Sequence, residues 1–177
     1  MESDSKIISK LCSFYVSDWH LVTMLLPYIN KKINEEIQIA TILEKEIANN
    51  VKTLVEKLNL KNEDKILNLN WNSTDAKKYS NISEILEKSN KKIIIIVNGN
   101  KDYIEYANKN IEKYINKNME KIKKQNKKIK VIDCYEIVEF NGSIVEILDK
   151  HDKILNTSGE KEINEIFEDY KRKEKII

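Results

Sequence analysis

The sequence predicts an α/β protein with three layers, in which helices cover both faces of a mostly parallel sheet. Segments with the pattern of strands alternate with amphipathic helical segments along all 177 residues, an order that builds parallel sheets with right-handed crossovers. The run Lys92–Gly99 is rich in isoleucine and does not alternate with polar residues, which is typical of a strand buried on both faces. No Pro- or Gly-rich linker divides the chain.

The length fits a single α/β domain, predicted over residues 10–177 after a disordered N-terminus at residues 1–9. Lysine and arginine total 31 against 29 acidic residues, and this near-balance argues against nucleic acid as a partner unless the basic residues gather on one face. The polar N-terminus lacks the apolar core of a signal peptide, and no window is apolar over the length of a membrane span. We therefore expect no membrane insertion and a cytoplasmic location.

Six strands and six helices are predicted in order. The strands lie at residues 11–16, 37–43, 66–71, 93–97, 129–135 and 153–156, the last of them at an edge of the sheet. The helices begin at Ser17 or Asp18 and at residues 46, 81, 101, 143 and 162, and the last four end near residues 88, 126, 150 and 173. Pro27 falls inside the first helical pattern and is expected to kink or break it, because proline lacks a backbone N–H.

The residues that usually carry chemistry are sparse and isolated. Gly99, Gly142 and Gly159 stand alone, so no glycine-rich phosphate loop can be built, and no cofactor is predicted. Cys12 and Cys134 lie in apolar stretches and are predicted to be buried reduced thiols in adjacent strands; a disulfide or metal pair is the alternative, although neither has a Cys or His at ligand spacing.

The two histidines offer only weak candidates. His20 follows Asp18 at the start of the first helix, and this pair could bind a metal or move a proton. His151 lies between Asp149 and Asp152 ahead of a predicted strand. A surface or capping role is the simpler interpretation of both, so neither a metal ligand nor a catalytic residue is predicted. The lysines at 121–128 are interpreted as a solvated helix end, with a basic patch as the alternative.

Aromatic residues gather at the predicted carboxyl ends of the strands, where open α/β sheets bind their ligands. Tyr15, Trp19, Trp71 and Tyr135 each lie at or just past such an end, although the two tryptophans could instead plug the core. Asn98 ends the central strand and Asp18 follows the first. The predicted ligand-binding residues are Tyr15, Asp18, Trp71, Asn98 and Tyr135.

Three stretches of the chain resemble the MEDS (methanogen/methylotroph sensory) domain family. The segment Leu11–Asp18, with the helix around Pro27 and the strand after it, is similar to the family's opening. Tyr135, followed by a glycine-containing turn and a helix, and the stretch His151–Leu155 are similar to its later segments. The chain departs from the family pattern at Lys10, where a histidine is usual, and at Asp152, where a proline is usual.

The resemblance implies a RecA-like fold that has lost its phosphate loop and serves as a sensory or regulatory input for signal transduction. Family members are thought to respond to small ligands such as hydrocarbon derivatives, often while joined to DNA-binding or signalling domains. Because this chain ends soon after the domain, we expect a stand-alone, non-enzymatic domain that binds a small molecule or a regulatory protein partner at the carboxyl edge of the sheet.

Two other functions remain open at this point. One is a nucleotide- or metal-binding enzyme with an unfamiliar site, using Asp18, His20 and Asn98. The other is an interaction module that presents the helices at 101–126 and 162–173 to a partner.

Overall fold

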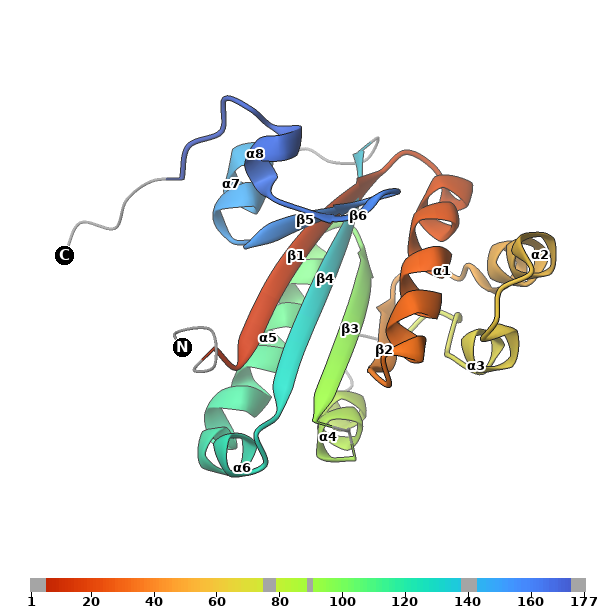
Figure 1. Ribbon diagram of the computed structural model, residues 1–177. Helices are drawn as coiled ribbons and strands as arrows, with labels where there is room; N and C mark the ends of the chain where they lie inside the picture. Colours follow the sequence, from red (N-terminus) through yellow and green to blue (C-terminus); the bar gives the residue numbers. More distant parts are fainter. Residues whose placement is uncertain (1–5, 75–78, 89–90, 138–142, 173–177) are drawn as a thin grey trace.

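The computed structural model describes residues 6–74, 79–88, 91–137 and 143–172. In this part of the chain one sheet has the strand order β2-β3-β4-β1-β5-β6 (Figure 1). The first five strands in that order run parallel, and β6 pairs antiparallel with β5. Helices pack on both faces, which confirms the predicted three-layer, RecA-like α/β fold.

The described residues form six strands and eight helices. The strands are β1 (Ile8–Tyr15), β2 (Gln38–Leu43), β3 (Lys92–Gly99), β4 (Lys128–Glu136), β5 (Lys153–Asn156) and β6 (Gly159–Lys161). The helices are α1 (Asp18–Asn34), α2 (Ala48–Leu58), α3 (Glu63–Leu67), α4 (Tyr79–Glu87), α5 (Lys101–Lys117), α6 (Met119–Lys124), α7 (Ile144–Asp149) and α8 (Ile163–Ile166). Within the described residues, no helix is long and apolar enough to cross a bilayer.

The β3 strand is buried on both faces, as predicted. All of its residues except Lys92 are buried, and it pairs with β2 on one side and β4 on the other. Its even-numbered isoleucines face the α1 side, and its odd-numbered ones face α5 on the opposite side. The β-branched run therefore supplies apolar surface to both cores at once.

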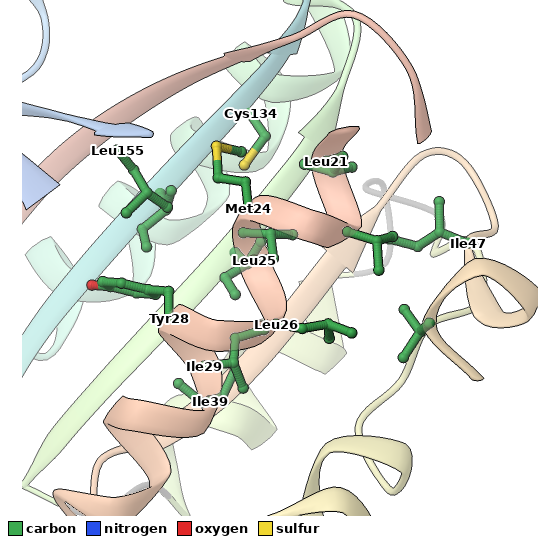
Figure 2. Close-up of a cluster of buried hydrophobic side chains, with 14 of the residues drawn as sticks. Leu21, Met24, Leu25, Leu26, Tyr28, Ile29, Ile39, Ile47, Cys134 and Leu155 are labelled. Atoms are coloured by element: carbon green, nitrogen blue, oxygen red, sulfur yellow. The ribbon is translucent and has the colours of Figure 1, made fainter. Parts of the chain in front are cut away.

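The core on the α1 side joins α1 and α2 to the sheet. Leu21, Leu25 and Ile29 lie on one face of α1 and are fully buried, and Figure 2 shows this helix lying across the strands. Met24 points from α1 toward Cys134 of β4 in the same view. The second core lies between the sheet and α4, α5 and α7.

The cysteines are buried free thiols in the adjacent strands β1 and β4, which confirms that prediction. They belong to different cores, because Cys12 faces α5 whereas Cys134 faces α1. Burial is the main cause that raises the pKa of Cys12 to about 12, so this thiol stays protonated at neutral pH.

Pro27 does not break α1, which continues from Asp18 to Asn34. The proline lies on the exposed side of the helix, while Leu26 and Tyr28 on either side of it are buried in the core. Packing of this amphipathic face therefore outweighs the loss of one backbone hydrogen bond.

The predicted strand at residues 66–71 is wrong. Ile66 is the buried residue of the short helix α3. The chain after α3 passes the end of β2 without forming a strand of the sheet. Two bonds hold this segment to β2: the Thr74 amide donates to the Leu43 carbonyl at 2.6 Å, and the Thr41 hydroxyl donates to the Asn70 carbonyl. The apparent alternation of apolar residues reflects burial against α1 and α2 rather than a pleated strand.

The C-terminal region also differs from the prediction. The strand β5 is not an edge, because β6 pairs outside it. The predicted amphipathic helix at residues 162–173 is reduced to α8, and the chain after it is held by side-chain bonds. The Tyr170 hydroxyl donates to Asp149 Oδ1 at 2.6 Å, and Arg172 donates to the carbonyls of Asp149 and His151.

Of three further predicted boundaries, those near the N-terminus and in α5 differ from the structure, and the one after β4 lies outside the described residues. The strand β1 begins at Ile8, so the N-terminal segment predicted to be disordered does not extend to residue 9; residues 1–5 lie outside the described residues. The predicted helix at 101–126 is divided at Asn118 into α5 and α6. The turn predicted at Asn141 and Gly142 also falls outside the described residues.

Candidate functional site: a polar pocket between α5 and α7

A cavity of about 270 Å³ lies on the α5 side of the sheet. Residues from the N-terminal half of α5 form one wall, and α7 with the residues just after it forms the other. Its floor comes from β1 and the carboxyl half of β4, and α5 lies behind these strands in Figure 1. We call this cavity the α5–α7 pocket.

Asp133 is the centre of the floor. It occupies a position in β4 that faces α5, and its side chain is only 1% exposed. Its Oδ1 accepts a hydrogen bond from Asn108 Nδ2 of α5 at 2.8 Å, and its Oδ2 lies 2.7 Å from His151 Nε2. A buried carboxylate is tolerated only when such partners replace water.

His151 has both ring nitrogens engaged. Its Nε2 meets the Asp133 carboxylate, and its Nδ1 lies 2.5 Å from the Ile147 carbonyl of α7. A carbonyl oxygen can only accept, so Nδ1 carries a proton, and a second proton lies between Nε2 and the carboxylate. No ring nitrogen is left to take a proton from a bound molecule, so this pair orders the pocket rather than supplying a general base.

Tyr135 is a predicted ligand-binding residue that does line the α5–α7 pocket. Its ring stacks on Phe14 with centroids 6.0 Å apart and meets the His151 ring edge-on at 6.2 Å. Burial, followed by the negative charge of Asp133, raises the pKa of its phenol. The tyrosine therefore contributes a neutral aromatic wall.

The other predicted site residues lie on the α1 side of the sheet. Tyr15 ends β1 and Asn98 is the last residue but one of β3. Both are fully buried, and Asn98 Oδ1 accepts from the Glu44 amide at 3.1 Å. Among the described residues, neither Tyr15 Oη nor Asn98 Nδ2 has a hydrogen-bond partner. Burial is the main cause that raises the pKa of Tyr15, and the nearby Asn98 side chain opposes the rise. Neither residue lines the α5–α7 pocket.

We expect Tyr15→Phe to change the free energy of unfolding by less than about 1 kcal/mol, or to stabilise the protein slightly. The substitution removes a buried hydroxyl that makes no hydrogen bond while keeping the ring that fills the core. Urea unfolding of the two proteins measures the difference. A loss above about 2 kcal/mol would mean that the hydroxyl makes a strong hydrogen bond after all.

Asp18 and Trp71 have structural roles. Asp18 lies in the first turn of α1, where a carboxylate interacts favourably with the helix dipole, and Ser17 caps the same helix by accepting from the His20 amide. Trp71 is buried in the core against α2 and α3, and its indole N–H donates to the Ile66 carbonyl at 2.8 Å. Trp19, by contrast, is half exposed. The predicted ligand-binding set is therefore divided between the two faces of the sheet.

The structure gives no support to a phosphate or metal site near His20. Only Val16 and Ser17 separate β1 from α1, too few for a phosphate-binding loop between strand and helix. His20 Nδ1 accepts from the Val16 amide at 3.0 Å, so one of its nitrogens is already used. In the described ranges, no three His, Cys, Asp or Glu side chains are grouped as metal ligands would be.

Comparison of the chain with models of protein families, with curated proteins and with solved structures gave no match. The resemblance to the sensory family therefore stays a prediction, and the function is argued from the geometry of the pocket.

Three pocket residues were missed by the sequence reasoning. The sequence favours a surface or capping role for His151, but the side chain is buried next to α7. Asp133 interrupts an apolar strand, and Asn108 lies on the buried face of α5; a polar residue in each of these places was the available signal. Their pairing depends on the register of β4 and on the placement of α7, neither of which a single sequence specifies.

Proposed function

We propose that this chain is a non-enzymatic sensory or regulatory domain that binds a small molecule in the α5–α7 pocket. The observation that carries the proposal is the ordered floor of the pocket, where Asn108 of α5 and His151, just after α7, both bond to Asp133 of β4. Such a floor is already formed before a ligand arrives, which lowers the entropic cost of binding. The walls add apolar surface from Ile104, Ile147 and Tyr135.

The chemistry of the floor favours binding over catalysis. The one histidine in the pocket has both nitrogens engaged, and the carboxylate beside it already accepts from Asn108 and faces the histidine. A general acid or base needs a free lone pair or a transferable proton within reach of its substrate. The predicted resemblance to a sensory domain agrees with this interpretation.

The position of the pocket suits a regulatory output. Residues of its α7 wall also hold the C-terminal segment, because Tyr170 bonds to Asp149 and Arg172 bonds to the carbonyl of His151. A ligand that shifts α7 would therefore change contacts made by residues 170–172. We propose this segment as the part of the domain that a regulatory protein partner would read.

A thermal-shift screen tests the proposed function. The panel contains ATP and GTP with magnesium, divalent metals, and small neutral, apolar, halogenated, acidic and basic compounds. A compound at about 100 times its Kd should stabilise the protein by about 2.7 kcal/mol, which corresponds to roughly 5–10 °C in Tm for a domain of this size. We expect such a shift from a small compound that the protein does not convert.

A pocket variant and a matched control locate the binding. Tyr135→Ala opens a wall of the α5–α7 pocket and should abolish the ligand-induced shift, measured against the variant's own Tm. Tyr15→Phe, at the buried tyrosine that ends β1 outside the pocket, should keep the shift. Stabilisation by nucleotide, turnover of the bound compound, or an unchanged shift in Tyr135→Ala would each contradict the proposal.

A further inference from the structure

We infer that the ligand of the α5–α7 pocket is a small monoanion such as a monocarboxylate, and that the Lys10 ammonium binds its negative charge. This inference rests on the proposed function, since it names the ligand class of the same pocket. It comes from the balance of charge among the residues that line the cavity.

The Asp133–His151 pair contributes no net charge. Because Nδ1 of His151 donates to a carbonyl, one further proton is shared between Nε2 and Asp133 Oδ2. If that proton lies on the ring, an imidazolium faces a carboxylate; if it lies on the oxygen, a neutral ring faces a carboxylic acid. The pair has a total charge of zero in both cases.

The rim of the pocket is also balanced. Lys101, Lys109 and Lys150 are matched there by three glutamates, Glu105, Glu112 and Glu146. One of these pairs closes across the mouth, with Lys101 Nζ 3.1 Å from Glu146 Oε2. The rim as a whole therefore offers no excess charge of either sign.

Lys10 is the lining charge that is left in excess, because the carboxylate that it faces, Asp133, is shared with His151. Its Nζ is 3.7 Å from Asp133 Oδ2, which is beyond hydrogen-bond distance, and that carboxylate is already neutralised by His151. The Lys10 side chain is only 20% exposed, so few water molecules can reach its ammonium group and accept hydrogen bonds from the three N–H donors. Among the described residues no other ion pair of Lys10 is formed. A single anionic group would satisfy this ammonium and bring the pocket to neutrality.

The rest of the cavity limits the size and shape of the anion. A volume of about 270 Å³ lies just below the usual range for drug-sized ligands. Ile104, Ile147 and Tyr135 give the lining an apolar portion that fits a short hydrocarbon body. A carboxylate on a short alkyl or aryl group meets both requirements.

The test uses three probes that share a four-carbon chain but differ in charge: butyrate is negative, butanol is neutral and butylamine is positive. Benzoate is added as a bulkier acid. Their affinities are measured by calorimetry for the wild-type chain and for Lys10→Met, Lys10→Arg and Lys52→Met. We expect the acids to bind at least tenfold more tightly than the alcohol or the amine. Lys10→Met should lose at least tenfold in affinity for the acids, and Lys10→Arg should keep most of it. The control Lys52→Met, at an exposed position of α2 outside the pocket, should stay within about twofold.

The outcomes separate this inference from the proposed function. Binding of the alcohol or amine as tight as that of the acids, or an acid affinity unchanged in Lys10→Met, would overturn the anion assignment while leaving a ligand-binding domain. Absence of binding by every probe here and by every compound of the thermal-shift panel would overturn both. Circular dichroism of each variant establishes that it is folded before its affinity is compared, and Lys10→Gln replaces Lys10→Met if the latter does not fold.

Discussion

His151→Ala should lower the free energy of unfolding by about 3–5 kcal/mol, because it leaves the buried carboxyl group of Asp133 without its main partner. Both side chains are 1% exposed, so water cannot replace the lost bond. For a domain of this size the loss corresponds to a fall in Tm of roughly 6–20 °C. Urea unfolding monitored by circular dichroism gives the value directly.

The second histidine supplies the control. His20 is partly exposed and accepts one backbone amide bond from Val16, so His20→Ala should cost about 1 kcal/mol or less. A further variant, Asp133→Leu with His151→Leu, removes both members of the pair and should be less destabilised than the sum of the two single changes. A loss below about 1 kcal/mol in His151→Ala would mean that the pair is not buried as described.

Trp71→Ala should cost about 3–5 kcal/mol of stability through loss of core packing rather than loss of a ligand contact. The indole is 4% exposed, fills the core against α2 and α3, and bonds to the Ile66 carbonyl. Trp71→Phe keeps part of the apolar volume and should recover a large share of the loss. The measurement is again urea unfolding, combined with the ligand-induced shift of each variant.

Trp19 is the matched control for Trp71, since the chain has two tryptophans and this one is 51% exposed. Trp19→Ala should change stability by no more than about 0.5 kcal/mol. If Trp71→Ala instead stayed as stable as the wild type while losing its ligand response, the binding site would lie on the α1 side of the sheet.

The fold could be predicted because its signals are local. The unalternating β3 run and the apolar stripe of α5 each indicate their burial directly. The prediction failed at residues 66–71 and after residue 162, where tertiary contacts decide the structure. Trp71 packs under α2 instead of extending the sheet, and bonds from Tyr170 and Arg172 hold the final segment in place of a longer helix.

The site could be predicted only in part, and for a physical reason. Tyr15 is the last residue of β1 and Tyr135 is the last but one of β4, but the two side chains lie on opposite faces of the sheet because side chains alternate along a strand. His151 lies 18 residues after Asp133, and the two meet only because the chain returns through α7. Lys10 reaches the same floor because β1 is inserted between β4 and β5.

The most direct test of the central claim is an amide NMR titration with a compound that stabilises the protein. Binding in the α5–α7 pocket predicts that the largest chemical-shift changes fall on the N-terminal half of α5, on α7, and around Lys10 and Asp133. Changes centred instead on the start of α1 and the ends of β1 and β3, around Tyr15 and Asn98, would contradict the pocket assignment and return the ligand to the α1 side of the sheet.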